Sequence, residues 1–205
     1  MTLLELLVSL GLTALIMAAV PTVIRITSQT LGATESLDHE AADRAAMDLV
    51  SRHLTQALSM YERGADGRLQ VMFRGEPKLI RFIAPATLGP AGGMFQFEVK
   101  AAGGTAEVAD PTARGVLFGW QLYRPMAAED KTPQDRHERL LFPDATDFTL
   151  SYFGASQARA DPEWSTTWSA TDAIPDLVEI RVTTRRAGAS QTRLIRIPLM
   201  LKPGR

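Results

Sequence analysis

The chain of 205 residues contains no cysteine. It therefore cannot form a disulfide scaffold, a thiolate zinc site or an iron–sulfur site, and it has no cysteine nucleophile. The absence does not decide the compartment, because a periplasmic protein can do without disulfides. Neither sign of charge predominates, since 22 basic and 23 acidic residues give a formal net charge of −1. This balance gives no electrostatic reason to expect a nucleic acid as a partner.

Motifs of the common enzyme classes are also missing. The chain has no Gly-x-Ser-x-Gly, no Walker motif and no His-Glu-x-x-His. Asp144 and Asp147 lack the spaced oxygen ligands and the glycine turn of a calcium loop. His39 and Asp43 lie four residues apart, but we expect them on a solvated, charged helix face. The sequence thus predicts no catalytic residue, no metal site and no cofactor.

Charge is nearly absent from one segment. Residues 1–24 hold 17 apolar residues and a single charge, on Glu5, and the 19 residues from Leu6 to Ile24 carry none. As a helix rising ~1.5 Å per residue, that run would span roughly 28 Å, close to the hydrocarbon core of a bilayer. This predicts a transmembrane helix over 1–24. A cleaved signal peptide is disfavoured, because no Lys or Arg precedes Arg25.

Glu5 is the unusual residue of this segment. A carboxylate costs on the order of 2.5–3.5 kcal/mol at mid-membrane and less near a helix end, so it requires a partner. No basic side chain is near it in sequence. The α-amino group of residue 1 in a neighbouring copy would neutralise Glu5 and fix an axial stagger between helices. A plain membrane anchor is the alternative interpretation.

The N-terminal segment resembles the mature N-terminus of type IV pilins and type II secretion pseudopilins. The match is Thr2-Leu3-Leu4-Glu5, the apolar residues behind it, and Pro21, near where such subunits carry a helix-breaking proline. The resemblance implies that a prepilin peptidase processes and methylates residue 1, here Met1 where the family usually has Phe, and that Glu5 aids recruitment into a filament. The core of that filament would include Leu3, Leu4, Leu6, Leu7, Leu10 and Pro21.

The rest of the chain predicts a continued helix over 25–62 and a β-rich domain over 63–205. Apolar residues at helical spacing between Ala46 and Tyr61 predict a helix to about Met60, ended by the glycines at 64 and 67. Alternation predicts strands over 69–73, 78–84, 94–100, 115–123, 148–153, 177–183 and 192–198, and a charged loop over 128–139. The expected fold class is α+β and pilin-like, with a long N-terminal helix, transmembrane in its first half, packed on antiparallel β-sheet.

The C-terminal half resembles the J-type minor pseudopilins of type II secretion. The strand over 148–153 precedes Trp164 and Trp168, spaced Trp-x-x-x-Trp, and then an Ile-Pro pair and an outgoing strand. The resemblance implies a tip complex with I-type and K-type minor pseudopilins, and contacts with H-type and major pseudopilins. That complex initiates the pseudopilus used to export folded proteins. A single pass through the inner membrane with the globular domain in the periplasm is also implied.

Trp164 and Trp168 are candidate partner contacts, because tryptophan in loops is enriched at interfaces. The alternative is that both rings cover the open end of a sheet within the monomer. Two other functions stay open. One is a minor type IV pilin that primes pilus assembly, and the other is a single-pass membrane-anchored binding or enzymatic domain unrelated to pilins.

Overall fold

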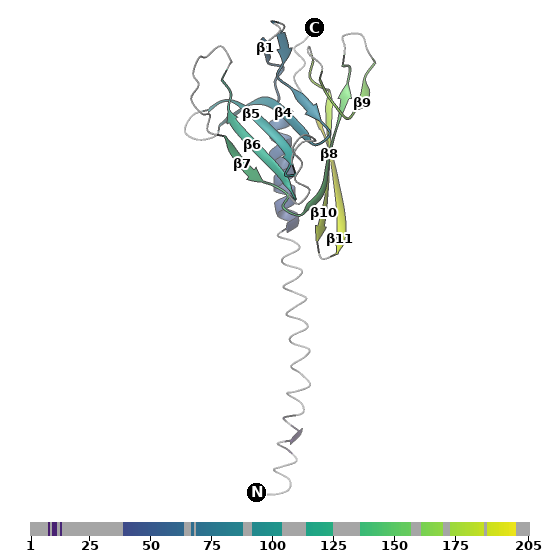
Figure 1. Ribbon diagram of the computed structural model, residues 1–205. Helices are drawn as coiled ribbons and strands as arrows, with labels where there is room; N and C mark the ends of the chain where they lie inside the picture. The colour runs from purple at the N-terminus through teal and green to yellow at the C-terminus, as the bar shows by residue number, and fades with distance from the viewer. Residues whose placement is uncertain are drawn as a thin grey trace. The chain divides into compact units, whose positions relative to one another are not determined.

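A computed structural model shows antiparallel sheets and a helix over residues 39–55 (Figure 1). The chain divides into two units, Met1–Ala45 and Ala46–Arg205, and all strands belong to the second unit. The structure describes residues 8, 10, 11, 13, 39–63, 67, 69–87, 92–103, 114–124, 136–156, 161–169, 173–186 and 188–199.

The larger sheet has five antiparallel strands in the order β3-β4-β5-β6-β7. Their bounds are β3 Arg74–Glu76, β4 Leu79–Thr87, β5 Gly92–Ala101, β6 Val116–Leu122 and β7 His137–Leu140. Because side chains alternate between faces, Phe82, Phe97 and Phe118 share one face, where the rings of neighbouring strands stack at 5.5 Å. This inner face forms one half of the core.

The second sheet has four antiparallel strands in the order β11-β10-β8-β9. Their bounds are β8 Ala145–Gly154, β9 Glu163–Ser165, β10 Leu177–Arg186 and β11 Ala189–Pro198. Its inner face is formed by β-branched and large apolar side chains, among them Leu150, Val178 and Ile180, which are at most 2% exposed. These residues belong to the same apolar cluster as the phenylalanines of the larger sheet. One hydrophobic core therefore serves both sheets.

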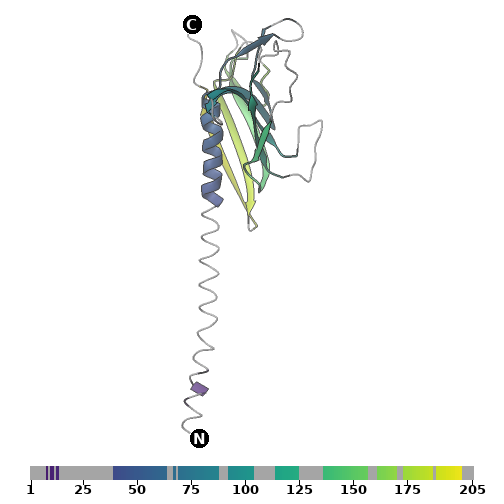
Figure 2. The ribbon, with the colours of Figure 1, turned by 90° about the vertical axis from the view of Figure 1, so that its left-hand side faces the viewer.

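Residues 46–57 supply a further wall of that core. Val50, Leu54 and Ala57 are buried in the cluster, and the imidazole of His53 stacks on the Phe97 ring at 4.4 Å. Figure 2 shows this part of the helix alongside the sheets. His53 is half-buried, and burial together with the charge of Arg52 lowers its pKa. It is thus an uncharged packing residue at neutral pH.

The helix ends earlier than its sequence pattern predicts. Amide-to-carbonyl bonds three residues apart close its last turn, and the amide of Leu58 then donates to the carbonyl of Ile83 at 2.9 Å. The chain next forms β1 (Tyr61–Arg63), which pairs with β2 (Leu69–Val71). The backbone of this segment bonds to strands rather than to the preceding turn, so the expected helix over 25–62 is corrected to one that ends at residue 55.

The expected fold class, an α+β pilin-like fold with a long N-terminal helix, is wrong for the part of the chain that the structure describes. That part consists mostly of antiparallel β-sheet, with one short helix that begins at His39. All seven expected strands are present, but β1, β3, β7 and β9 were not expected. All four have only three or four residues, and β7 lies at the end of the expected charged loop, which it overlaps at residues 137–139.

The expected transmembrane segment over 1–24 lies outside the described residues, except for Val8, Leu10, Gly11 and Thr13. Leu10 is helical and 67% exposed. Among the described residues, no helix combines the length and the apolar character needed to cross a bilayer. Several predicted site residues also lie outside the described part of the chain, namely Met1, Leu3, Leu4, Glu5, Leu6, Leu7 and Pro21.

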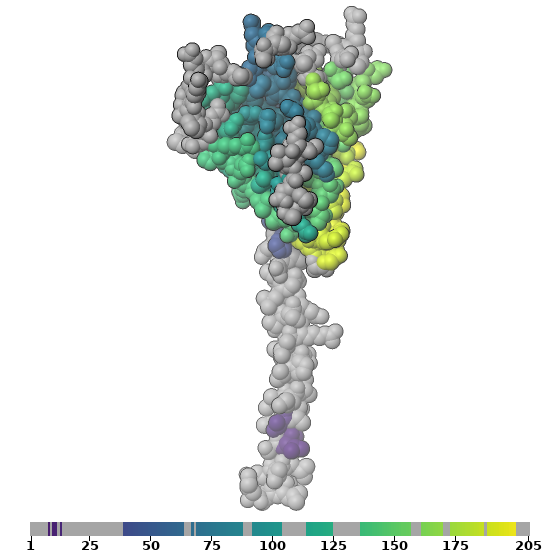
Figure 3. Space-filling view, in the orientation of Figure 1, coloured from purple at the N-terminus to yellow at the C-terminus, as the bar shows by residue number. Residues whose placement is uncertain are grey.

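The two larger sheets are joined at β3. Gly75 and Trp168 exchange two backbone hydrogen bonds of 3.0 and 2.8 Å, and the amide of Leu150 in β8 donates to the carbonyl of Pro77 at 2.9 Å. The Tyr152 hydroxyl donates to the carbonyl oxygen of Glu76 at 2.9 Å. On the face shown in Figure 3, the blue residues of β2–β4 lie beside the green and yellow residues of the four-stranded sheet. The sheets are thus bonded through backbone groups as well as through the core.

Gly75 makes this joint possible, because the Tyr152 ring occupies the place of its missing side chain. A Cβ on Gly75 would lie 2.6 Å from Cε1 of Tyr152. We therefore expect Gly75→Ala to reduce the free energy of unfolding by about 2 kcal/mol, through forced displacement of a packed ring. Urea denaturation followed by tryptophan fluorescence measures this.

Gly119→Ala is the matched control for Gly75→Ala. Gly119 is also a buried strand glycine, but the nearest atoms to its added Cβ would be at 3.6 Å, an ordinary contact. We expect a change below about 0.5 kcal/mol there. Equal stability of Gly75→Ala and the wild-type chain would show that the Tyr152 ring is not confined against β3.

Candidate functional site

The two tryptophans proposed from sequence have different environments. Trp168 is 2% exposed, and its indole N–H donates to the carbonyl of Ala173 at 2.9 Å. Its backbone forms the bridge to Gly75 that joins the sheets. The Trp168 ring is therefore a structural element of the core and offers almost no surface to a partner.

Trp164 lies in β9 and is 45% exposed. Its indole packs against the Phe153 ring with centroids 5.3 Å apart, and the guanidinium carbon of Arg196 lies 5.5 Å from its centroid. A guanidinium at that distance over an indole is a cation–π contact. Trp164 is thus held in place by neighbours while almost half of it faces solvent, which suits a preordered contact residue.

The sheet register extends this exposed surface across four strands. Trp164 pairs with Phe153, Phe153 with Leu177, and Leu177 with Pro198, so the four residues form one row on the outer face. Leu194, two rows away on β11, is 48% exposed. The outer face of the four-stranded sheet therefore carries an apolar row that the core does not use.

Charged residues border this row. Glu179 is 8% exposed and accepts from Arg196 Nε at 2.8 Å and from Arg181 Nη2 at 3.2 Å. The side chains of Arg181 and Arg196 are 50% and 61% exposed. We name this surface the tryptophan face. It consists of the row Trp164, Phe153, Leu177 and Pro198 together with Arg181, Leu194 and Arg196. Its chemistry, an exposed tryptophan with one arginine beside it and a second arginine on the same face, is that of protein–protein contact residues.

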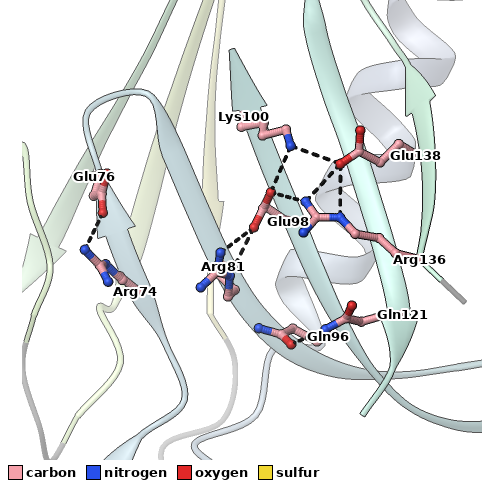
Figure 4. Close-up of polar contacts among 9 residues, drawn as sticks. All are labelled: Arg74, Glu76, Arg81, Gln96, Glu98, Lys100, Gln121, Arg136 and Glu138. Atoms are coloured by element: carbon pink, nitrogen blue, oxygen red, sulfur yellow. Dashed lines mark hydrogen bonds and ion pairs between the residues drawn. The ribbon is translucent and has the colours of Figure 1, made fainter. Parts of the chain in front are cut away.

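A second polar site lies on the outer face of the five-stranded sheet (Figure 4). Cross-strand pairing aligns one residue from each strand in a row: Arg74, Arg81, Glu98, Gly119 and Glu138. At its centre, Glu98 is 7% exposed and accepts from Arg81 Nη2 at 2.6 Å and Nε at 3.1 Å. The same carboxylate contacts Arg136 and, at 3.3 Å, Lys100. We name these residues the charged row.

Arg136 crosses the charged row at Gly119. This glycine sits between Glu98 and Glu138 in the row, and Arg136 passes over it to reach Glu98. The Nη2 atom of Arg136 lies 3.8 Å from the position that a Cβ of Gly119 would occupy. Arg136 and Lys100 also contact Glu138, each at 2.9 Å. Three cations thus enclose two carboxylates.

The network shifts the pKa of both glutamates. Burial acts to raise the pKa of Glu98, but the hydrogen bond from Arg81 and the charges of Arg81, Arg136 and Lys100 outweigh it, so this pKa lies below its ordinary value. The hydrogen bond from Lys100 is the largest cause that lowers the pKa of Glu138. Both carboxylates are therefore ionised at neutral pH and unsuited to act as general acids there.

The sequence patterns predict which face some residues of the charged row occupy, but they do not predict that these residues form a row. Alternation in the expected strands over 78–84 and 94–100 puts Arg81 and Glu98 on outward-facing positions, but it gives no cross-strand register. Arg136 and Glu138 were assigned to a loop. In the part of the chain that the structure describes, no three His, Asp or Glu residues come together as a set that could hold a metal ion. Asp144 and Asp147 are instead paired with Arg186 and Lys78.

Comparison with known proteins gives no match to a family model and none to a curated protein.

The charged row predicts a specific acid sensitivity. A carboxylate whose folded-state pKa is depressed contributes stability above its unfolded-state pKa, and this contribution is lost as the pH falls through the folded value. For Glu98 and Glu138, the loss begins as the pH approaches 4.5, the ordinary pKa of a glutamate, and continues below it. We expect the melting temperature to drop steeply over that range, as measured by circular dichroism.

Glu98→Gln should lower the free energy of unfolding by roughly 1–3 kcal/mol at pH 7, because charge-assisted hydrogen bonds are lost. It should also flatten the decline of stability in acid, since one of the titrating groups is gone. Glu163→Gln, which removes an exposed carboxylate on β9, is the matched control and should change neither quantity. An unchanged acid profile in Glu98→Gln would exclude Glu98 as a source of the sensitivity.

Proposed function

We propose that this chain is a J-type minor pseudopilin of a type II secretion system, an assembly subunit rather than an enzyme. The observation that carries the proposal is Thr2-Leu3-Leu4-Glu5 followed by an uncharged run to Ile24. The Trp-x-x-x-Trp spacing of Trp164 and Trp168, between two strands of one sheet, supports the J type. The function is the initiation, at the filament tip, of the pseudopilus that exports folded proteins.

The proposed mechanism assigns separate tasks to the two ends of the chain. The apolar N-terminal segment anchors the subunit in the inner membrane, and on assembly it leaves the lipid to pack among the same segments of other subunits. Glu5 then pairs with the α-amino group of a neighbour, which removes two charges from an apolar surrounding. The β-rich unit lies in the periplasm and binds I-type and K-type subunits.

The tryptophan face is the proposed contact for one of these subunits. Trp164 offers a large aromatic surface whose orientation is already fixed by Phe153 and Arg196, so little conformational entropy is lost on binding. Interface energy concentrates on such tryptophan and arginine residues. Trp168, in contrast, supports the domain itself.

Mass spectrometry of the N-terminus tests the assignment most directly. Purification from a strain with an active prepilin peptidase should give a processed chain with an N-methylated residue 1. An unprocessed, unmethylated N-terminus in that strain would contradict the proposal and favour a membrane-anchored domain unrelated to pilins. Neighbouring genes for a secretin and a secretion ATPase, rather than for pilus subunits, would separate a pseudopilin from a minor type IV pilin.

Glu5→Ala should insert into the membrane but assemble poorly. We expect recovery of I-type and K-type subunits with the tagged chain to fall roughly tenfold, as the loss of an ion pair worth about 1.4 kcal/mol would produce. Quantitative immunoblotting after membrane extraction measures this. Glu40→Ala, which removes a carboxylate that lies outside the apolar segment and pairs with Arg44 at 2.8 Å, is the control. Full recovery with Glu5→Ala would contradict the role of Glu5.

Trp164→Ala should weaken the same complex without unfolding the domain. An exposed aromatic contact residue at an interface is worth about 2 kcal/mol or more, so affinity should fall at least ~30-fold. Tyr61→Ala is the matched control, because Tyr61 is 47% exposed in β1, outside the tryptophan face. Surface plasmon resonance with immobilised I-type subunit measures both. Equal effects of the two variants would exclude the tryptophan face as the contact.

A further inference from the structure

A hollow of about 400 Å³ lies at the β3–β4 end of the charged row. This volume is within the range of small-ligand sites, roughly 300–1,000 Å³. Its apolar lining comes from Met72, which is half-buried, and from Val71 and Phe73, which are buried, and Gln96 and Ser169 contribute neutral polar groups. Neither the tryptophan face nor the proposed filament contacts make use of this hollow.

Two arginines line the hollow side by side. Arg74 and Arg81 are direct cross-strand partners on β3 and β4 (Figure 4), and both residues belong to the lining of the hollow. Like charges placed opposite one another on neighbouring strands destabilise a sheet. Each arginine has a glutamate partner, Glu76 at 2.8 Å and Glu98 at 2.6 Å, but neither glutamate is among the described residues of the lining. Two guanidiniums therefore line the hollow, and the glutamates that balance their charge lie outside its described lining.

The arginines keep hydrogen-bond donors for that occupant. Arg74 contacts Glu76 through Nη2, and Arg81 contacts Glu98 through Nε and Nη2. A guanidinium carries five N–H groups, so each has donors beyond those used by its glutamate. The amide oxygen of Gln96 accepts from Gln121 at 2.8 Å, which leaves the Gln96 NH₂ group as a further donor. The polar wall is thus rich in donors.

We propose that this hollow binds a carboxylate carried on an apolar body. The carboxylate lies between Arg74 and Arg81, because the planar guanidinium matches carboxylate oxygens in paired hydrogen bonds. The apolar part of the ligand lies against Met72 and the small exposed parts of Val71 and Phe73. Such a carboxylate is the side chain or the chain end of a peptide. The inference does not depend on the assignment of the chain as a pseudopilin.

Isothermal titration calorimetry of the full chain in non-ionic detergent tests the site. The probes are acetyl-Val-Asp-Val-amide, acetyl-Val-Ala-Val with a free C-terminus, acetyl-Val-Asn-Val-amide and inorganic phosphate, each corrected by titration into detergent alone. At least one carboxylate peptide should bind ten times more tightly than the asparagine peptide, and which one does so identifies the carboxylate as side chain or chain end. Binding no tighter than that of the asparagine peptide would overturn the proposal, as would phosphate binding equal to that of the better peptide.

Variants locate the binding in the hollow. Arg74→Gln should weaken binding of the better peptide about tenfold, whereas Glu76→Gln, which removes the competing carboxylate, should strengthen it several-fold. Arg44→Gln is the matched control, because Arg44 is likewise exposed and paired with a glutamate at 2.8 Å, and it belongs neither to the hollow nor to the tryptophan face. It should leave the affinity unchanged. Equal losses in Arg74→Gln and Arg44→Gln, or weaker binding in Glu76→Gln, would overturn the assignment of this site.

Discussion

The contact between the Tyr152 ring and the backbone of Gly75 is the constraint on which the rest of the β-rich unit depends. It brings an aromatic ring of one sheet against a strand of the other, where any side chain on residue 75 would collide with it. Burial raises the pKa of Tyr152, so its hydroxyl stays protonated and donates to the carbonyl of Glu76. Because this joint fixes β3, it also fixes Arg74 and Glu76 on the opposite side of that strand.

The outer faces of the two larger sheets carry the same arrangement of charged residues. Each has a nearly buried glutamate that contacts two arginines. Glu98 contacts Arg81 on the neighbouring strand and Arg136 just before β7, and Glu179 contacts Arg196 on the neighbouring strand and Arg181 on its own strand. A buried carboxylate without partners would be costly, so the arginines are held near the sheet surface by the charge that they neutralise. Part of each guanidinium still faces solvent. The outer faces are therefore ordered, donor-rich surfaces, which differ in whether an aromatic residue or a hollow adjoins the arginines.

Sequence patterns predicted the long strands correctly because their alternation is strong and local. They failed where structure depends on distant partners. Tyr61 fits the helical spacing of the preceding apolar residues, but its segment pairs with β2 as a strand, and the periodicity of the sequence does not predict this pairing. The strand β3 has three residues with glycine at its centre, and it is held by β4 and by Trp168, which follows β9 in the chain. The row of Arg74, Arg81 and Glu98 depends on register, which one sequence does not reveal.

The same limit explains why Trp164 and Trp168 looked equivalent in the sequence and are not. A spacing of four residues does not indicate which of the two rings lies inward. It also does not indicate where the strand that contains Trp164 ends. In the structure, β9 stops at Ser165, and the chain then turns before Trp168 meets Gly75. The segment therefore places one indole outward, beside Phe153, and the other inward, at the joint. A force exerted on Trp164 by a partner acts on β9. This strand pairs with β8, and the chain that follows it is bonded to β3 through Trp168, so the force is transmitted to the core rather than to a free loop.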